Sequence, residues 1–362
     1  MTTKLAPVTS PADCKAAIQR ENRRVTSYDV ALLAGVSQSA VSRCFKPGAS
    51  VSKATYARVM KAAQGLDYIP NAAARSLITR RSNIVGVIIS HLANLYHPEA
   101  LSELSQQINR RGKRVLLFTW QNELDVEHVL TDVWQYQVDG VIASAPLSDA
   151  HVAEFSRRDV PLVAFNPGQA SQLVNSVVCD QREAGHMLVS RLAAAGHRLF
   201  GIIDGPESNA VCNERRRGCA ERLAQLGYPA PVIVRGNFDY ASGARGLRDI
   251  IAQAGRVPDA LICGNDVMAF GAIDCARHEL GISVPGELSV AGFDAAEASN
   301  WLSYQLTTLR LPVQKMAVAA AELLSNLIDT HDGDAERRVF APQFIEGATA
   351  RLTLPASVSL AA

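Results

Sequence analysis

The spacing of apolar residues divides the chain into two parts. Between residues 26 and 66, apolar positions recur at helical spacing and are interrupted by short polar turns. From residue 84 onward, continuous apolar runs such as "IVGVIIS" and "RVLLFTW" alternate with helical segments. Such runs are typical of strands that are buried on both faces of a parallel sheet. The pattern therefore predicts a small helical unit followed by a larger α/β unit.

The helical part has the order of a helix-turn-helix. Thr26 and Asp29 form a capping box that starts the first helix, and Gly35 permits a sharp reversal after it. Ser37 caps a second helix and Ser52 a third. The apolar positions that these helices are expected to bury are Val30, Leu33, Ala34, Val41, Tyr56, Val59, Ala63 and Leu66. Three helices of this size are expected to enclose one small core.

The α/β part contains two successive series of strands and helices. Strands are expected at residues 84–90, 114–120, 139–145, 161–165, 198–204, 231–236, 259–265 and 288–293. Two series indicate two doubly wound lobes of parallel sheet with helices on both faces. In such sheets ligands bind beyond the carboxyl ends of the strands, so the cleft between the lobes is the expected ligand site.

Charge is distributed unevenly between the two parts. Residues 1–81 carry 13 Lys and Arg against four Asp and Glu, a net charge of +9, and the remaining residues carry 23 against 31, a net charge of −8. A positive charge concentrated at one end indicates a polyanionic partner. The second helix turns Gln38, Ser39, Ser42 and Arg43 outward. Since Gln pairs with adenine edges, Arg with guanine, and Ser with bases or phosphates, this helix is expected to enter the major groove of DNA.

Two segments of the chain have no core of their own. Residues 1–24 are rich in Thr, Ser, Pro and Ala and end in "RENRR", which predicts a mobile N-terminal arm. Residues 70–83, "PNAAARSLITRRSN", favour helix, but a helix this short is marginal alone in water. The second segment is therefore expected to become ordered on meeting a partner.

No membrane, export or catalytic motif is found. The chain has no run of eighteen apolar residues and no secretory signal, so a cytoplasmic location is expected. The seven cysteines form no C-x-x-C pair, so no disulfide framework and no metal site are expected. No cofactor is expected, because the chain lacks G-x-G-x-x-G, phosphate-loop, G-x-S-x-G and H-E-x-x-H motifs.

The helix-turn-helix segment and several runs after it resemble a known family. The runs "VTSYDVALLAGVSQSAVSRCF" and "VSKATYARVMKAAQGLDYIPNAAARSL" closely match the signature of the LacI-type repressor family, and the resemblance extends from residue 25 to about residue 352. Downstream markers are "RLAAAGHR", "GPESN", "NERRRG", "GNDVMAFGA", "VAGFD" and "LTTLRLP". The resemblance implies a homodimer that binds a pseudo-palindromic DNA operator and responds to a small-molecule effector.

The resemblance also implies which residues contact DNA. The contacts of the helical unit are Tyr28, Ser37, Gln38, Ser39, Ser42, Arg43 and Tyr68. A hinge helix would enter the minor groove and make contacts through Asn71, Ala74, Arg75 and Leu77. Leu77 matches the leucine that wedges between base pairs. Ala40 stands where the family usually has Thr, and Lys46 where Asn is frequent, so the operator sequence stays open.

The effector site follows from the same resemblance. The α/β part is similar to the two-lobed periplasmic sugar-binding fold, with crossovers between the lobes near residues 180, 311 and 340. The family's effector contacts fall on Asn94, Tyr96, Asn166, Arg215, Phe238, Asn265 and Asp294. Polar groups that converge from both lobes suit hydroxyls or a carboxylate. A sugar, a sugar acid and a purine-like compound all stay open, as does the direction of the effect on DNA binding.

The fold class is therefore α/β, with an N-terminal three-helix helix-turn-helix DNA-binding domain followed by a two-lobed periplasmic-binding-protein-like domain of doubly wound parallel sheets. The expected segments are an arm at 1–24, the DNA-binding domain at 25–70, a hinge at 71–82, an N-lobe at 83–180, a C-lobe at 181–310, a return to the N-lobe at 311–340, and the C-lobe end and tail at 341–362. The tail has Pro355 and no leucine heptad, so no tetramer is expected.

The predicted function is a transcriptional repressor controlled by a small molecule, and not an enzyme. One alternative is a doubly wound enzyme with an accessory helical domain, but its catalytic motifs are missing. A transport binding protein of the same fold would need an export signal. An architectural DNA binder would share the basic module, and only effector-dependent release from an operator separates it from a regulator.

Overall fold

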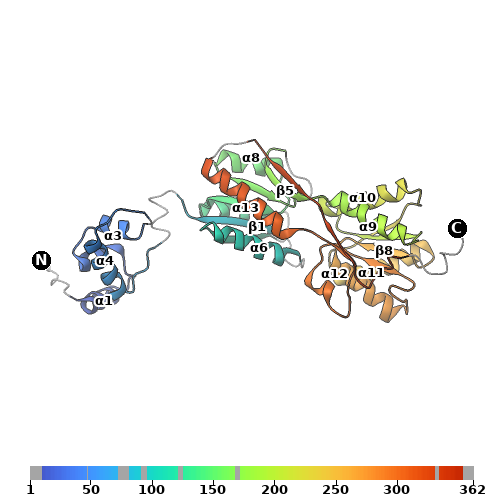
Figure 1. Ribbon diagram of the computed structural model, residues 1–362, viewed down its shortest axis with the longest axis horizontal. Coiled ribbons are helices and arrows are strands. Elements are labelled where there is room, and N and C mark those ends of the chain that lie inside the picture. The colour runs from blue at the N-terminus through green and yellow to red at the C-terminus, as the bar shows by residue number, and fades with distance from the viewer. Residues whose placement is uncertain are drawn as a thin grey trace. The chain divides into compact units, whose positions relative to one another are not determined.

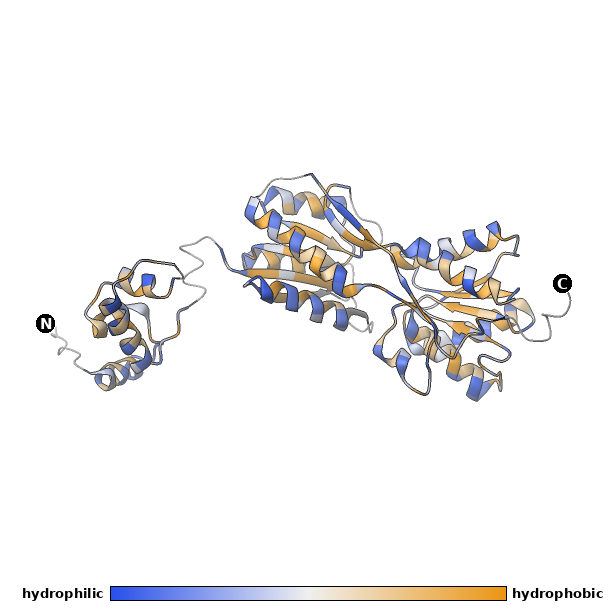
Figure 2. Ribbon diagram, in the orientation of Figure 1, coloured by the Kyte–Doolittle hydropathy of each residue, from blue (hydrophilic) through white to orange (hydrophobic). Residues whose placement is uncertain are grey.

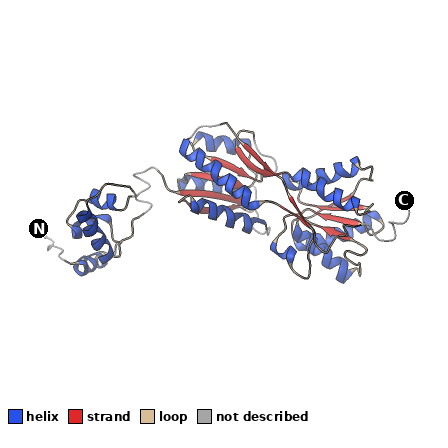
Figure 3. Cartoon of the chain, viewed as in Figure 1, coloured by secondary structure: helices blue, strands red, loops and turns tan. Residues whose placement is uncertain are grey.

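Two compact units make up the protein, and they divide after Ser82 (Figure 1). The computed structural model describes residues 10–46, 48–71, 81–90, 96–120, 125–167, 172–330 and 334–353. In these residues the first unit is helical, and the second is built from parallel sheets covered by helices (Figure 3). The predicted α/β class with a helical N-terminal unit is confirmed.

The first unit contains the predicted helix-turn-helix. Its three helices are α2 (Ser27–Ala34), α3 (Gln38–Cys44) and α4 (Lys53–Gly65). Gly35 ends α2 with a φ of 62°, a left-handed conformation that glycine adopts without strain, and this reverses the chain. Val30, Val41, Val59 and Leu66 lie fully inside the core. The prediction that Tyr56 is buried is wrong, because that residue is 48% exposed. Ala62 of the same helix is buried instead.

A fourth helix, α1 (Pro11–Arg20), corrects the prediction of a mobile arm for residues 10–24. The hydroxyl of Ser10 accepts the N–H of Asp13 and starts the helix. Cys14 and Ile18, one turn apart, are buried in the core of the helix-turn-helix. Composition does not reveal this helix, because two apolar side chains suffice to dock it once a neighbouring core receives them. Residues 1–9 lie outside the described part.

The N-lobe of the second unit is a six-stranded parallel sheet. Its strand order is β11-β5-β4-β3-β1-β2. The strands are β1 (Ile84–Ser90), β2 (Arg114–Trp120), β3 (Gly140–Ser144), β4 (Leu162–Phe165), β5 (Asn175–Cys179) and β11 (Arg337–Phe340). The helices are α6 (Tyr96–Arg110), α7 (Val126–Gln135), α8 (Asp149–Arg157) and α13 (Val313–Thr330). Figure 2 shows that hydrophobic residues concentrate on the strands.

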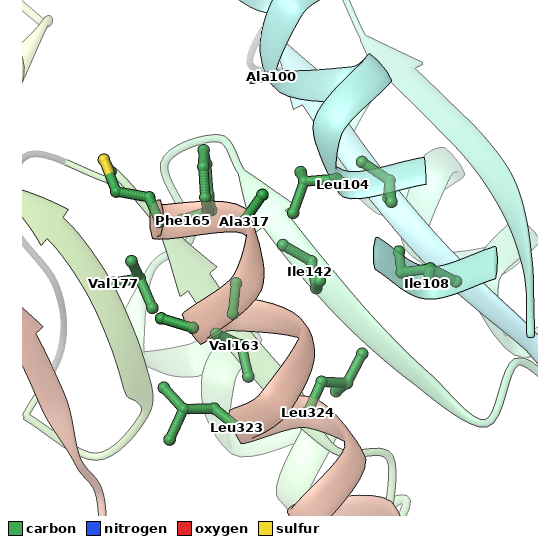
Figure 4. Close-up of a cluster of buried hydrophobic side chains, with 14 of the residues drawn as sticks. Ala100, Leu104, Ile108, Ile142, Val163, Phe165, Val177, Ala317, Leu323 and Leu324 are labelled. Atoms are coloured by element: carbon green, nitrogen blue, oxygen red, sulfur yellow. The ribbon is translucent and has the colours of Figure 1, made fainter. Parts of the chain in front are cut away.

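The core of the N-lobe lies between the sheet and the helix pair α6 and α13. Figure 4 shows Leu104 and Ile108 of α6 beside Ile142 of β3, with Leu323 and Leu324 of α13 nearby. The opposite face is covered by α7 and α8 through a second cluster. Because both faces are buried, the strands read as continuous apolar runs, as the sequence predicts.

The C-lobe is a four-stranded parallel sheet in the order β7-β6-β8-β9. The strands are β6 (Phe200–Asp204), β7 (Val232–Arg235), β8 (Ala260–Cys263) and β9 (Ser289–Ala291). Helices α9 (Gln181–Ala194) and α10 (Ala210–Gln225) cover one face. The other face carries α11 (Tyr240–Ala254) and α12 (Asp266–Asp274), which continues as the short π-helix η2 (Cys275–Glu279). A 3-10 turn, η3, spans Glu297–Asn300.

Three short crossovers join the lobes. Asp180 alone separates β5 from α9. Leu311 and Pro312 separate β10 (Thr308–Arg310) from α13. Ala341 and Pro342 separate β11 from β12 (Gln343–Ile345), which pairs antiparallel with β10. The chain therefore passes between the lobes at three places with one or two residues at each.

Candidate nucleic-acid interface and ligand site

A carboxylate network fixes the start of α2. Asp29 accepts the backbone N–H of Thr26 at 2.8 Å and its hydroxyl at 2.7 Å. Both terminal nitrogens of Arg23 donate to the same carboxylate, at 2.7 and 2.8 Å. These bonds, first of all those from Arg23, lower the pKa of Asp29 to about 2. The carboxylate is thus ionised at neutral pH and holds the first turn of α2.

Helix α3 presents the predicted recognition residues to solvent. The Ser37 hydroxyl accepts the N–H of Ala40 at 3.3 Å and caps the helix, and Val41 anchors it in the core. Ser39, Ser42 and Arg43 are exposed on the outer face. Gln38 is half-buried, and its amide donates to the Ser27 hydroxyl at 3.2 Å. This bond ties the start of α3 to the start of α2, so the two helix N-termini lie at one edge of the unit.

The other predicted DNA contacts of this unit are only partly within the described residues. Tyr28 is 71% exposed beside Ser27. Tyr68 is half-buried and packs edge-on against Phe45, with the ring centres 5.6 Å apart. Asn71 is exposed. The hinge positions Ala74, Arg75 and Leu77 lie outside the described residues, so the hinge helix stays a prediction.

Two lysines that sequence reasoning did not assign to DNA lie near Arg43. A hollow of about 520 Å³ at the end of α3 is lined by Arg43, Lys46, Lys53 and Tyr56, among others. These four side chains come from the end of α3 (Arg43), the turn that follows it (Lys46) and the start of α4 (Lys53 and Tyr56). The signal in the sequence was a Lys on each side of the "PGASVS" turn. The hollow extends the positive surface beyond the recognition helix.

A buried arginine organises the candidate ligand site in the C-lobe. Arg215 of α10 donates to Gln181 Oε1 at 2.8 Å, to the Gly264 carbonyl at 2.8 Å and to Asp294 Oδ1 at 2.7 Å. Its guanidinium carbon also lies 4.6 Å from the centre of the Phe293 ring. Burial by itself lowers the pKa of Arg215, but the neighbouring Asp294 carboxylate outweighs burial and raises it. Arg215 therefore keeps its charge inside the lobe, 2.7 Å from Asp294 Oδ1.

Two more predicted residues join this group at the carboxyl ends of the strands. Asn265 follows β8, and its side-chain oxygen accepts the N–H of Met268 at 3.0 Å, which caps α12. Its amide nitrogen donates to the Phe238 carbonyl at 3.3 Å. Phe238 has a φ of 62°, and its ring packs so closely on Gly205 that a Cβ there would lie 2.6 Å from it. Phe238 is thus held by its backbone and by its ring.

Gln181 connects the two lobes and was not found from the sequence. Its amide nitrogen donates to Asn166 Oδ1 at 3.2 Å, and its oxygen accepts from Arg215. Asn166 follows the N-lobe strand β4, and Arg215 belongs to the C-lobe. The only signal in the sequence was its place at the first crossover, directly after Asp180. Asn166, Arg215, Phe238, Asn265 and Asp294 therefore form one connected group.

Two further buried aspartates lie at or just after the carboxyl ends of the C-lobe strands β6 and β8. Asp266 accepts the N–H of Ala296 at 2.8 Å and the hydroxyl of Thr308 at 2.7 Å, and burial raises its pKa well above the usual value. It ties α12 to the loop after β9 and to β10. Asp204, at the end of β6, lies 2.8 Å from Arg216 and 2.7 Å from Arg235.

The remaining predicted contacts fall outside what the structure describes. Asn94 and the side chain of Tyr96 are not among the described residues, so their place relative to Arg215 stays a prediction. In the described part of the chain, no group of three His, Cys, Asp or Glu side chains is arranged to hold a metal ion. No helix in that part is long and apolar enough to cross a membrane.

Two family models match the chain. Residues 26–71 match the model described as "Bacterial regulatory proteins, lacI family". Residues 189–350 match the periplasmic binding protein-like domain. The two matches therefore fall on the helix-turn-helix unit and on the C-lobe together with the segment that returns through the N-lobe.

Relatives and solved structures cover nearly the whole chain. The HTH-type transcriptional repressor PurR of Aliivibrio fischeri is 30% identical over 88% of this chain and 95% of its own length. Catabolite control protein A of Priestia megaterium is 29% identical over 86% of this chain and 95% of its own. The lac repressor dimer bound to operator and the anti-inducer ONPF is 25% identical, with a TM-score of 0.83 over 90% of this chain and 99% of that one. The chain therefore belongs to the lacI family of bacterial regulatory proteins.

Proposed function

We propose that this protein is a transcriptional repressor whose affinity for its operator is set by a small molecule. The observation that carries the proposal is the outer face of α3, where Ser39, Ser42 and Arg43 project from a helix fixed by capping and core packing. A rigid helix with short polar side chains and one guanidinium suits the major groove. A homodimer presents two such helices, so the operator is pseudo-palindromic.

The DNA contacts divide by chemistry. Gln38 and Arg43 carry the groups that pair with base edges, with Gln suited to adenine and Arg to guanine. Gln38 must exchange its bond to Ser27 for a base edge in order to do so. Ser39 stands with Gln38 and Arg43 at the recognition positions. Tyr28, Ser37, Ser42 and Tyr68 supply hydroxyls for the backbone, and Asn71 belongs to the hinge. Ala74, Arg75 and Leu77 belong to the proposed hinge helix, which enters the minor groove. There Leu77 inserts between two base pairs and opens the step.

The effector site is the group centred on Arg215 and Asp294. Because the two charges balance, the pair offers both hydrogen-bond donors and acceptors, and adjacent hydroxyls of a sugar match that pattern. Asn166 and Asn265 add neutral amides, and Phe238 adds an aromatic ring. Asn94 and Tyr96 are the proposed contacts from the N-lobe. The effector is thus a sugar, a sugar acid or a related metabolite.

Linkage connects this site to DNA. Gln181 is hydrogen-bonded to Asn166 in one lobe and to Arg215 in the other. A ligand that changes either hydrogen bond therefore changes the relative orientation of the lobes. A coupling of roughly 1–3 kcal/mol corresponds to about a 5- to 150-fold change in operator affinity. The protein acts in the cytoplasm, where bacterial operators lie.

Two measurements test the proposal. Selection of fragmented genomic DNA on the purified full chain at physiological salt is expected to recover one or a few sites with two-fold symmetry. A thermal-shift screen of sugars, sugar acids and nucleobases is expected to show a ligand that raises the melting temperature and alters operator affinity. Equal binding to all fragments, with and without the ligands, would contradict the proposal. Turnover of the ligand would instead favour the alternative of a doubly wound enzyme with an accessory helical domain.

A further inference from the structure

Helix α1 is an addition to the family's DNA-binding domain. The lacI family model begins at residue 26, so α1 lies outside it. The helix is nevertheless firmly docked, because Cys14 and Ile18 are buried in the core and Lys15 pairs with Asp67. Pro11 lies so close to Gly65 that a Cβ on that glycine would be 3.1 Å from the proline ring. The segment is therefore built to hold a fixed position.

The residues that join α1 to α2 alternate between anchored and exposed positions. The backbone N–H of Arg23 donates to the Ile18 carbonyl at 3.3 Å, and its guanidinium is bound to Asp29. Val25 packs against the core of the unit. Arg24 stands between these two anchors, and its side chain is exposed. It makes no ion pair with any residue in the described ranges, so its positive charge is not compensated.

Arg24 lies three residues before Ser27, at the start of α2, where the start of α3 also lies. Ser27 receives the hydrogen bond from Gln38 at the start of the recognition helix. Tyr28, the next residue, is among the most exposed aromatic side chains in the described residues. The acidic groups nearby, Glu21 and Asp29, are both bound by Arg23 and thus leave Arg24 free to attract an anion.

We propose that Arg24 is a DNA-backbone contact that α1 holds in place, next to the base pairs read by α3. The inference rests on the proposed function, and its partner is the phosphate backbone of duplex DNA. Because α1 fixes the segment before binding, the contact forms with little loss of conformational entropy. A charge on a loose arm would reach the same phosphate at a greater entropic cost.

The experiment compares full-length variants on one operator recovered from genomic DNA and on a random-sequence duplex. Arg24→Ala removes the contact, Arg24→Lys keeps the charge, and Arg256→Ala removes an equal charge from an exposed position in the C-lobe. Each phosphate contact contributes about 0.9 to the slope of log affinity against log salt. Arg24→Ala is expected to lower that slope by roughly 1.8 for the two copies in a dimer. Its affinity at 0.1 M salt is expected to fall on the order of tenfold per copy, on both duplexes alike.

The controls separate this inference from the proposed function. Arg24→Lys is expected to keep most of the slope, and Arg256→Ala to keep all of it. An unchanged slope for Arg24→Ala, alongside a wild type that still prefers its operator, overturns the phosphate contact alone. A wild type without any operator preference overturns the proposed function itself.

A further variant tests the role of α1. Ile18→Asn undocks the helix without changing the charge and keeps Arg24, so circular dichroism first establishes that the remaining fold is intact. This variant is expected to lose part of the salt slope because Arg24 is no longer held in place. A full slope in the folded variant overturns the positioning role of α1.

Discussion

Arg215 and Asp294 form an ion pair in which 2.7 Å separates Nη2 from Oδ1, and only 5% and 6% of their side chains are exposed. Each charge depends on the other, because a lone buried charge has no solvent to stabilise it. Gln181 and the Gly264 carbonyl accept two further hydrogen bonds from the guanidinium. The pair is therefore both a support of the C-lobe and the centre of the proposed effector site.

Removing one partner of this pair is expected to destabilise the C-lobe strongly. Asp294→Ala leaves the Arg215 charge buried and unpaired, and the free energy of unfolding should fall by about 3–5 kcal/mol. The double variant Arg215→Met with Asp294→Leu removes both charges and should recover most of that loss. Urea denaturation followed by circular dichroism measures both. If the double variant is as unstable as the single one, burial of charge is not the cause.

The stability of the first unit is expected to fall at acidic pH. The pKa of Asp29 is about 2 in the folded protein and 3.8 in the unfolded chain. Its contribution to the free energy of unfolding is therefore complete above about pH 4 and is lost as the pH falls toward 2. We expect this contribution to be about 1 kcal/mol, because solvent screens the charge of Arg23. Amide hydrogen exchange of α2 measures this locally. In Asp29→Asn the same pH range should produce no such loss.

The docking of α1 is expected to stabilise the helix-turn-helix core. Ile18→Ala removes a buried side chain at the contact with α2 and α4 and should cost about 2–4 kcal/mol in that unit. The neighbouring Gln19→Ala changes an exposed position of the same helix and should be neutral. Hydrogen exchange of α2 and α4 compares the two variants. Equal exchange in both would mean that α1 adds no stability.

Arg43 is expected to read a base. Arg43→Ala should weaken binding to the preferred operator by about 1–3 kcal/mol and relax the preference at one base pair in each half-site. Binding to a random-sequence duplex should change much less. Competition titrations against operators with single base-pair changes measure this. A uniform loss on every sequence would assign Arg43 to the backbone instead.

Local patterns were sufficient where a residue interacts with its own element. The capping of α2, α3 and α4 and the alternation of strands and helices follow from short-range preferences, so they were predicted correctly. The docking of the N-terminal segment on the core of the helix-turn-helix was not predicted. Ile18 is buried only because the core of the next three helices receives it, and composition carries no information about that contact.

The candidate site shows the same limit. Asn166, Arg215 and Asp294 were expected there from the family resemblance, but their hydrogen bonds depend on Gln181, which no motif singles out. Asp266 looks like an ordinary residue after a strand, yet Thr308, 42 positions away in the sequence, donates to it. Only the folded topology brings such residues together, so the residues that support a site are harder to find than those that carry the motif.

The three crossovers limit how the lobes can turn. Asp266 holds Thr308 on the C-lobe, and Leu311 and Val313 are both buried in the N-lobe core, so any rotation at that crossover is confined to the short stretch from Leu309 to Pro312. The other two crossovers offer only Asp180 and the pair Ala341 and Pro342. Proline fixes one backbone torsion at two of these three places. The lobes are thus joined by a stiff triple pivot, which favours a small rotation along one direction over a wide opening.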